Sequence, residues 1–120
     1  MSNVKKLTKN NFRNDGVILK DFDNKLVLIK FYTDWCGFCK RAAPDYEELG
    51  NQYKKNDKVV IAKMDADKNK EFLDHLNKFG KWPGVHGFPT ILLFKNNLYL
   101  AQYSGNRTVE DYINFINKYY

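Results

Sequence analysis

Residues 26–40 read LVLIKFYTDWCGFCK and join an apolar run to a pair of cysteines. The first seven, Leu26–Tyr32, are apolar on both alternations except at Lys30, which predicts a buried strand that needs cover on both faces. Cys36 and Cys39 follow three residues apart, where the pattern becomes helical. We therefore expect a buried strand to deliver both cysteines to the beginning of a helix.

The sequence that follows alternates between helical and extended patterns. The helix after Cys36 carries an apolar stripe, and Pro44 should kink it. A strand over Val59–Met64 comes next, and Asp67 is a suitable N-cap for a second helix that Gly80 ends. The apolar residues are Ala42, Ala43, Tyr46, Leu49 and Tyr53 in the first helix and Phe72, Leu73, Leu76 and Phe79 in the second.

The last part of the chain predicts a hairpin and a final helix. Strands over Thr90–Phe94 and Tyr99–Tyr103 flank Asn96-Asn97, a pair that suits a tight turn between antiparallel strands. Thr108 then opens a helix, with Asp111 three residues further on.

With a short strand over Val4–Leu7 at the beginning, the elements follow the order βαβαβαββα. Strands separated by helices favour parallel pairing through right-handed crossovers, whereas the hairpin requires an antiparallel edge. The expected fold class is therefore α/β, with a central mixed parallel and antiparallel sheet flanked by helices on both faces. No internal repeat or linker divides the chain, so we expect a single domain over residues 1–120.

The composition argues against several classes of protein. Hydrophobic residues make up 43% of the chain, which predicts a core, yet no apolar run approaches the roughly 18 residues of a membrane span. The net charge of +6 comes from scattered lysines, without the clustered arginines of a nucleic-acid reader. No apolar segment suited to a signal peptide follows the N-terminus. We expect a cytoplasmic monomer that binds neither nucleic acid nor membrane.

The position of the two cysteines predicts their chemistry. Unpaired N–H groups and a partial positive charge at the beginning of a helix favour a thiolate at Cys36, the form that attacks disulfides. Cys39 faces the same way one turn later, so it can resolve the mixed disulfide. Because Cys39 is shielded from solvent, we expect its pKa to be high. Trp35, Gly37 and Phe38 surround the pair, and this dithiol is a redox centre that needs no added cofactor.

Other interpretations remain open at this point. Zinc binding would recruit His75 and His86, but their separations from the cysteines and from each other do not match compact zinc-finger spacings, and we expect no metal. The fold could also be a relic with inert cysteines. A further alternative is a non-catalytic module that binds a protein partner or has a structural role.

Four motifs, in order along the chain, resemble the thioredoxin superfamily and more closely the catalytic a-type domains of protein disulfide isomerases. Residues 26–36 look like that family's central strand and the approach to its cysteines, and Pro44 matches its helix-kinking proline. Phe88-Pro89-Thr90 resembles its cis-proline loop. Residues 103–108, YSGNRT, resemble the segment of disulfide isomerases whose arginine swings toward the resolving cysteine.

The resemblance implies a thioredoxin fold and a thiol–disulfide oxidoreductase that reduces, oxidises or isomerises protein disulfides. Cys36 would attack, Cys39 would release the substrate, and Arg107 would tune Cys39 by approaching it. The partners would be protein or peptide thiols and disulfides, together with a reductase or an oxidant. A cis bond before Pro89 would place the Phe88 backbone beside Cys36 to receive an extended peptide, unless Phe88 packs in the core.

Three departures from the family pattern concern this site. Between the cysteines stands Gly37-Phe38, where thioredoxins usually have Gly-Pro and disulfide isomerases Gly-His, and we expect a reduction potential between those of the two. Lys30 occupies the position of the family's buried carboxylate: it would act as a neutral base if buried, favour a Cys39 thiolate if charged, or extend its amine to solvent. Residues 80–84, GKWPG, look like a short insertion before the cis-proline loop. An exposed Trp82 there would bind substrate, and a harmless surface bulge is the alternative.

Overall fold

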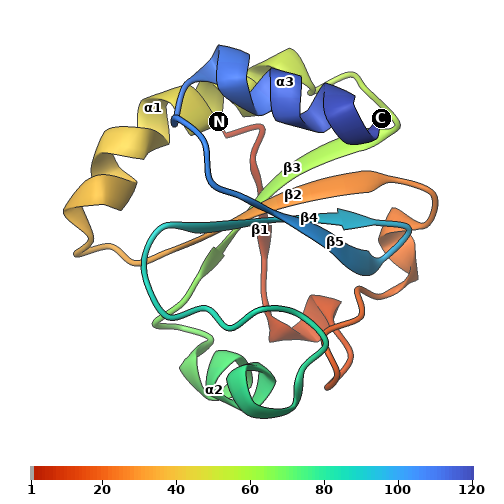
Figure 1. Cartoon of the computed structure of the whole chain (residues 1–120), viewed down its shortest axis with the longest axis vertical. Helices are drawn as coiled ribbons and strands as arrows, with labels where there is room; N and C mark the ends of the chain where they lie inside the picture. Colours follow the sequence, from red (N-terminus) through yellow and green to blue (C-terminus); the bar gives the residue numbers. More distant parts are fainter. Residues whose placement is uncertain (1) are drawn as a thin grey trace.

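β2 (Leu26–Tyr32) is the central strand of a five-stranded sheet in the computed structural model, which describes residues 2–120 (Figure 1). The strand order is β1-β3-β2-β4-β5. α1 and α3 cover one face of the sheet and α2 covers the other. The remaining bounds are β1 (Lys5–Leu7), α1 (Gly37–Gln52), β3 (Val59–Asp65), α2 (Lys70–Phe79), β4 (Thr90–Lys95), β5 (Leu98–Tyr103) and α3 (Val109–Tyr119).

Strand pairing is parallel on one side of β2 and antiparallel on the other. β3 runs parallel to the whole of β2, whereas β4 pairs antiparallel with both β2 and β5. Asn96 and Asn97, which join β4 to β5, have φ of 51° and 70°, the left-handed values that a tight hairpin turn needs. The predicted mixed sheet and its hairpin are therefore confirmed.

Between β1 and β2 the chain forms two short 3₁₀ helices, Lys9–Asn11 and Lys20–Phe22, instead of the predicted α-helix. Asn and Asp are frequent over residues 10–24, and their side chains compete with the helical backbone for hydrogen bonds. The Thr8 side chain, for example, accepts from the Asn10 N–H, while the Asn11 side chain accepts from the Thr8 N–H. These local bonds favour turns over a continuous helix.

The beginning of α2 differs from the prediction by two residues. Asn69 is its N-cap, so the prediction of Asp67 in that position is wrong. The carboxylate of Asp65 accepts hydrogen bonds from the N–H groups of Asp67 and Lys68, at 3.0 and 3.1 Å. Asp65 therefore forms the turn that precedes the helix, and the Asp67 carboxylate is left for another partner.

Side chains from the sheet build two hydrophobic cores, one on each face. Tyr46 of α1 is fully buried in the core beneath α1 and α3. Its hydroxyl lies 3.0 Å from the carbonyl oxygen of Leu28 and 2.7 Å from that of Ala62, and it donates to both. α1 is thereby tied to β2 and β3, the two strands that lead into and out of the cysteine-bearing helix.

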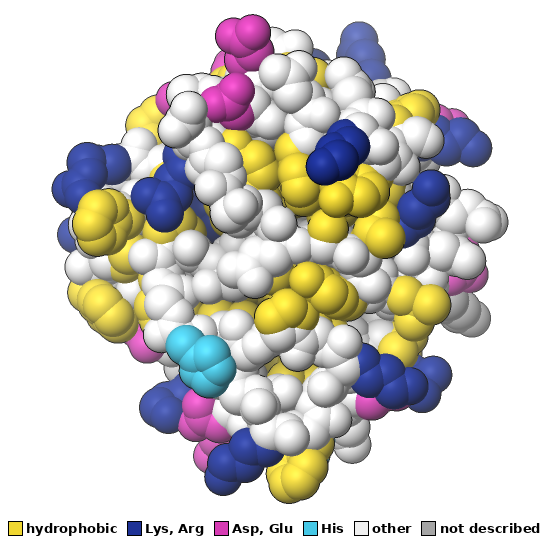
Figure 2. Space-filling view, viewed as in Figure 1, with side chains coloured by type: hydrophobic (Ala, Val, Ile, Leu, Met, Phe, Trp, Pro, Cys, Tyr) yellow, Lys and Arg dark blue, Asp and Glu magenta, His cyan; other side chains and the backbone are white. Residues whose placement is uncertain are grey.

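The surface shown in Figure 2 carries Lys and Arg side chains in scattered positions around its rim. This distribution matches the scattered lysines of the sequence. No helix among residues 2–120 combines the length and hydropathy needed to cross a bilayer.

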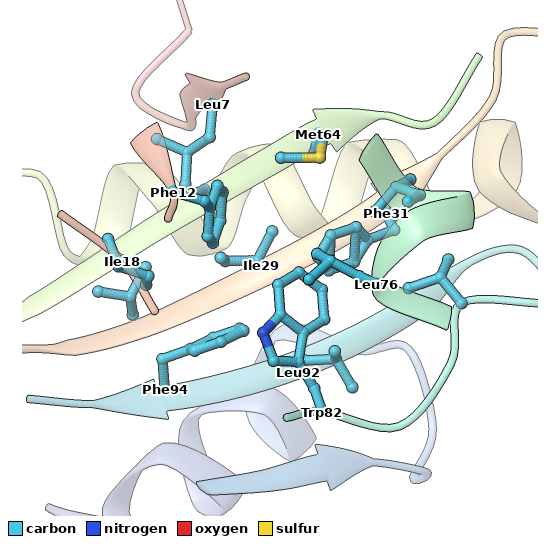
Figure 3. Packing of buried hydrophobic residues seen from close by; sticks show 14 of the residues in the cluster. Leu7, Phe12, Ile18, Ile29, Phe31, Met64, Leu76, Trp82, Leu92 and Phe94 are labelled. Carbon is cyan, nitrogen blue, oxygen red and sulfur yellow. The ribbon is translucent and has the colours of Figure 1, made fainter. Parts of the chain in front are cut away.

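Trp82 lies in the core between the sheet and α2, with only 8% of its surface exposed (Figure 3). Its ring centroid is 5.4 Å from that of Phe31 and 5.2 Å from that of Phe94. Its indole N–H donates to the Gly16 carbonyl oxygen at 2.9 Å, and a Cβ at residue 16 would collide with the indole. The prediction of Trp82 as an exposed substrate-binding residue is wrong, because the ring turns inward to fill this core.

Trp82→Phe is expected to lower the free energy of unfolding by about 2 kcal/mol, because the smaller ring leaves a void and the Gly16 carbonyl loses its donor. Urea unfolding followed by circular dichroism measures the change. Trp35→Phe is the matched control at a side chain that is 67% exposed, and it should cost less than about 0.5 kcal/mol. Equal costs for the two variants would contradict the core role of Trp82.

Candidate active site

Cys36 is the N-cap of α1, at the end of the loop that leaves β2. Its Sγ accepts a hydrogen bond from the backbone N–H of Cys39 at 3.2 Å, so the sulfur occupies the place of an N-capping oxygen. The N–H groups at this end of a helix carry partial positive charge, and one of them points at this sulfur. Gly37 is the first residue of the helix, so the predicted succession of strand, cysteine and helix is confirmed.

Cys39 lies inside the first turn of α1 and is 3% exposed. Burial raises the pKa of the Cys39 thiol to about 11, and its hydrogen bond with Cys36 acts in the same direction. The predicted shielded, weakly acidic cysteine is therefore confirmed. At neutral pH Cys39 is a thiol, and it must lose a proton before it can attack a disulfide.

Iodoacetamide is expected to modify Cys36 at least tenfold faster than Cys39 near pH 7. A thiol with a pKa of about 11 is ionised in only about one molecule in ten thousand at that pH. The rate at Cys39 should also rise about tenfold per unit of pH up to about pH 10. Timed quenching and peptide mapping by mass spectrometry measure both rates. Faster alkylation of Cys39 than of Cys36 would reverse the assigned order of attack.

The loop before β4 places its backbone beside Cys36. The peptide bond between Phe88 and Pro89 is cis, as predicted, and the Cys36 thiol donates to the Phe88 carbonyl oxygen at 3.5 Å. The Phe88 ring is half-buried: it packs against the core and also meets the exposed Trp35 edge-on, with centroids 6.0 Å apart. The indole N–H of Trp35 in turn donates to Asp67 Oδ2 at 2.9 Å. The Asp67 carboxylate, which does not cap α2, therefore binds Trp35.

A pocket of about 230 Å³ lies beside Cys39, and Lys30 lines it. The Lys30 side chain is only 3% exposed, and its Nζ lies 4.8 Å from the ring centroid of Tyr46 and 5.8 Å from that of Tyr32. Burial lowers the pKa of the Lys30 amine. The alternative in which this amine extends to solvent is therefore wrong.

Lys63 and Glu47 line the same pocket. Lys63 is the register partner of Lys30 on β3, and its Nζ lies 3.3 Å from Glu47 Oε2. Within the described residues no carboxylate lies within ion-pairing distance of Lys30. Sequence reasoning missed both residues. The alternation of side chains along β3 was an available signal for Lys63, because it assigns that lysine to one face of the sheet.

Phe38 is exposed and contacts two guanidinium groups. The Cζ of Arg41 lies 4.7 Å from the Phe38 ring centroid, and the Cζ of Arg107 lies 5.8 Å from it. Arg107 is therefore at the site as predicted, placed over Phe38. Arg41 was not predicted as a site residue. Its spacing of three residues from Phe38 was an available signal, because residues three apart on a helix lie on the same face.

The residues considered for zinc are not brought together with the cysteines. His75 is exposed on α2 and His86 is exposed in the loop before β4. Over residues 2–120 no group of three or more His, Cys, Asp or Glu side chains is arranged to hold a metal ion.

Comparisons with known proteins agree with this geometry. A family model described as Thioredoxin matches residues 3–118. The chain is 42% identical over 118 residues to protein disulfide isomerase-like 2-2 of Oryza sativa subsp. japonica, and 43% identical over 118 residues to protein disulfide-isomerase 1 of Dictyostelium discoideum. Both matches cover 98% of this chain but only 29% and 30% of the relatives, so the chain spans less than a third of their length.

Solved structures show the same fold. Thioredoxin f from spinach chloroplast, in its long form, matches with a TM-score of 0.71 at 28% identity, over 96% of this chain and 84% of that one. Human ERp44 form I matches with a TM-score of 0.75 at 24% identity, over 98% of this chain and 29% of that one. The fold that the sequence motifs implied is confirmed.

Proposed function

The chain belongs to the thioredoxin family, and we propose that it is a thiol–disulfide oxidoreductase acting on protein and peptide disulfides. One observation carries the proposal. The Sγ of Cys36 caps α1 and lies beside the Phe88 backbone, while Cys39 is held one turn behind it as a protonated thiol. This arrangement separates an attacking sulfur from a resolving sulfur.

In the reductive direction, the Cys36 thiolate attacks one sulfur of the substrate disulfide, and the other sulfur leaves as a thiolate that takes up a proton. Cys39 then loses its proton and attacks the Sγ of Cys36. The intramolecular disulfide forms and the second substrate thiol is released. The substrate disulfide is thus reduced to two thiols by the two electrons of the dithiol, so no added cofactor is required. A dithiol reductant restores the protein, and the oxidative direction runs the same steps backward.

Lys30 is the proton acceptor for Cys39 in this proposal. Its amine lines the pocket beside Cys39, and burial lowers the pKa of that amine, which favours the neutral, proton-accepting form. Once protonated, Lys30 becomes a cation close to the new Cys39 thiolate and stabilises it. The Glu47–Lys63 ion pair supports this assignment, because it engages the neighbouring cation and leaves Lys30 without a carboxylate partner in the described residues.

The substrate peptide lies along the Phe88 backbone in this proposal. That segment is beside Cys36, and an extended peptide can add to it by strand-like hydrogen bonds. Trp35 and Phe38, both exposed, supply an apolar rim for the substrate. Arg107 tunes Cys39 by moving from its position over Phe38 toward the resolving sulfur.

Reduction of insulin disulfides by dithiothreitol, followed as turbidity, tests the proposed function. The reduced protein should accelerate the reaction well above the uncatalysed rate. A rate equal to the background, from protein whose circular dichroism shows it folded, would favour the alternative of a non-catalytic binding module.

A further inference from the structure

Two arginines from different parts of the chain contact the ring of Phe38. Arg41 comes from the second turn of α1, and Arg107 comes from the loop before α3. Their guanidinium carbons lie 4.7 and 5.8 Å from the centroid of the Phe38 ring, within the range of a cation–π contact. The exposed ring therefore positions two cations that the sequence separates by 66 residues.

Arg41 lies close to the attacking cysteine. Arg41 folds back along α1, so that its Nη1 is 3.5 Å from the point where a side chain of Gly37 would begin. Gly37 is the residue that follows Cys36 in the chain. The positive charge of Arg41 therefore lies against the first turn of the helix.

Neither arginine is neutralised by the part of the chain that the structure describes. Its four ion pairs involve Arg13, Lys63, Lys70 and Lys81, and none involves Arg41 or Arg107. Arg13 provides the contrast, because its Nη2 lies 2.8 Å from Asp15 Oδ2. Figure 2 shows Lys and Arg side chains beside exposed hydrophobic ones at the left edge of the view, over the beginning of α1.

The opposite side of Cys36 has different electrostatics. A groove of about 260 Å³ between the Phe88 loop and α2 is lined by Trp35 and Phe88 together with Asp67, Lys70 and Asp74, and the last two form an ion pair at 2.7 Å. The positive charge in this groove is therefore paired, whereas the two guanidinium groups on Phe38 have no ion-pair partner among residues 2–120. A substrate that crosses Cys36 meets these guanidinium groups at one end and a groove of mixed, partly paired charge at the other.

We propose that Arg41 and Arg107 bind a carboxylate of the substrate, so that this protein prefers disulfides carrying a carboxylate one or two residues from the reacting sulfur. This inference rests on the proposed oxidoreductase function. A guanidinium fork matches the geometry of a carboxylate, and an extended chain advances about 3.3 Å per residue, so a carboxylate one or two residues from the reacting sulfur lies within roughly 3 to 7 Å along the chain from it. Acidic polypeptides and glutathione, a tripeptide with two carboxylates, both present this chemistry.

The test compares kcat/KM for two matched pairs of disulfides. One pair is a reporter peptide joined to glutathione and the same peptide joined to glutathione dimethyl ester. The other is a disulfide peptide with Glu beside its Cys and the same peptide with Gln. The wild-type protein should prefer the carboxylate form about fivefold, the scale of one or two exposed ion pairs, and salt should reduce the preference. A preference in the first pair alone identifies glutathione as the carrier of the bound carboxylate. A preference in the second pair alone identifies an acidic polypeptide as that carrier.

The double substitution Arg41→Gln and Arg107→Gln should reduce the carboxylate preference to about one. The preference is the ratio of kcat/KM for the two disulfides of a pair. If Arg107 also tunes Cys39, that effect changes kcat/KM for both disulfides by the same factor, so the ratio reports carboxylate binding alone. Lys54→Gln with Lys55→Gln is the matched control: it removes two charges at the opposite end of α1, and the preference should stay at its wild-type value.

A wild-type protein without preference in either pair would overturn this inference, as would a preference that survives the arginine substitutions or falls equally in the lysine control. In each of these results the neutral disulfides are still reduced, so the oxidoreductase function stands. Failure to reduce any of the four substrates would instead overturn the proposed function itself.

Discussion

Cys36→Ser is expected to lower catalysed insulin reduction to the uncatalysed rate, a loss of about a thousandfold or more. The serine hydroxyl has no accessible anionic form near neutral pH, and it cannot form a disulfide, so the first step of the cycle has no nucleophile. The fold should persist, because the serine oxygen can accept the N–H of residue 39 as an ordinary N-cap. Turbidity measures the activity, and circular dichroism measures the fold.

Cys39→Ser is the matched variant at the resolving position. It should still form a mixed disulfide through Cys36 but should fail to release it, so a covalent complex accumulates. Mass spectrometry under non-reducing conditions detects this complex. Residual turnover in Cys36→Ser above the rate of a double cysteine variant would remove Cys36 from its role as the attacking sulfur.

Lys30→Met is expected to slow the release of a mixed disulfide from Cys36 by about a hundredfold near pH 7, the scale of a lost general base. Cys39 would keep its proton, because the substitution removes both the proton acceptor and a charge that lowers the pKa of the Cys39 thiol. The rate should recover as pH rises toward that pKa. A stopped-flow trace of thionitrobenzoate released from a Cys36 adduct measures the step at each pH.

Lys63→Met is the control for Lys30→Met. It removes one cation from the same pocket and frees Glu47, whose charge raises the pKa of the Lys30 amine, but Lys30 itself remains, so release should slow by no more than about threefold. Methionine fills a similar volume at Lys30, so thermal unfolding should show a stable fold. An unchanged release rate and pH profile in Lys30→Met would show that another group accepts the proton.

Local patterns predicted most of the architecture. The apolar run of β2, the hairpin at Asn96-Asn97 and the Thr108 cap each depend on neighbouring residues, and all three are found in the structure. The cysteine pair was also predictable, because its chemistry follows from its place after a strand and at the beginning of a helix. Motif order then indicated the cis bond before Pro89, which no local propensity would have shown.

The errors concern side chains whose partners are distant in sequence. Trp82 looked like part of a surface insertion, but its indole bonds to Gly16, 66 residues earlier, and fills the core. Asp67 had the composition of an N-cap, yet Asp65 makes that turn. The Glu47–Lys63 pair likewise depends on the packing of α1 over β3. Such contacts are set by tertiary packing, which periodicity does not encode.

The two halves of α1 differ in how they are attached to the sheet. The Tyr46 hydroxyl fastens the helix to two strands, whereas Pro44, just before Tyr46, has no N–H to offer the carbonyl of Lys40. The segment from Gly37 to Ala43 therefore lacks one helical hydrogen bond to the part of α1 that Tyr46 ties to the sheet. We expect displacements that accompany the making and breaking of the sulfur–sulfur bond to be confined to this first segment, which leaves the rest of the chain the same shape in both oxidation states.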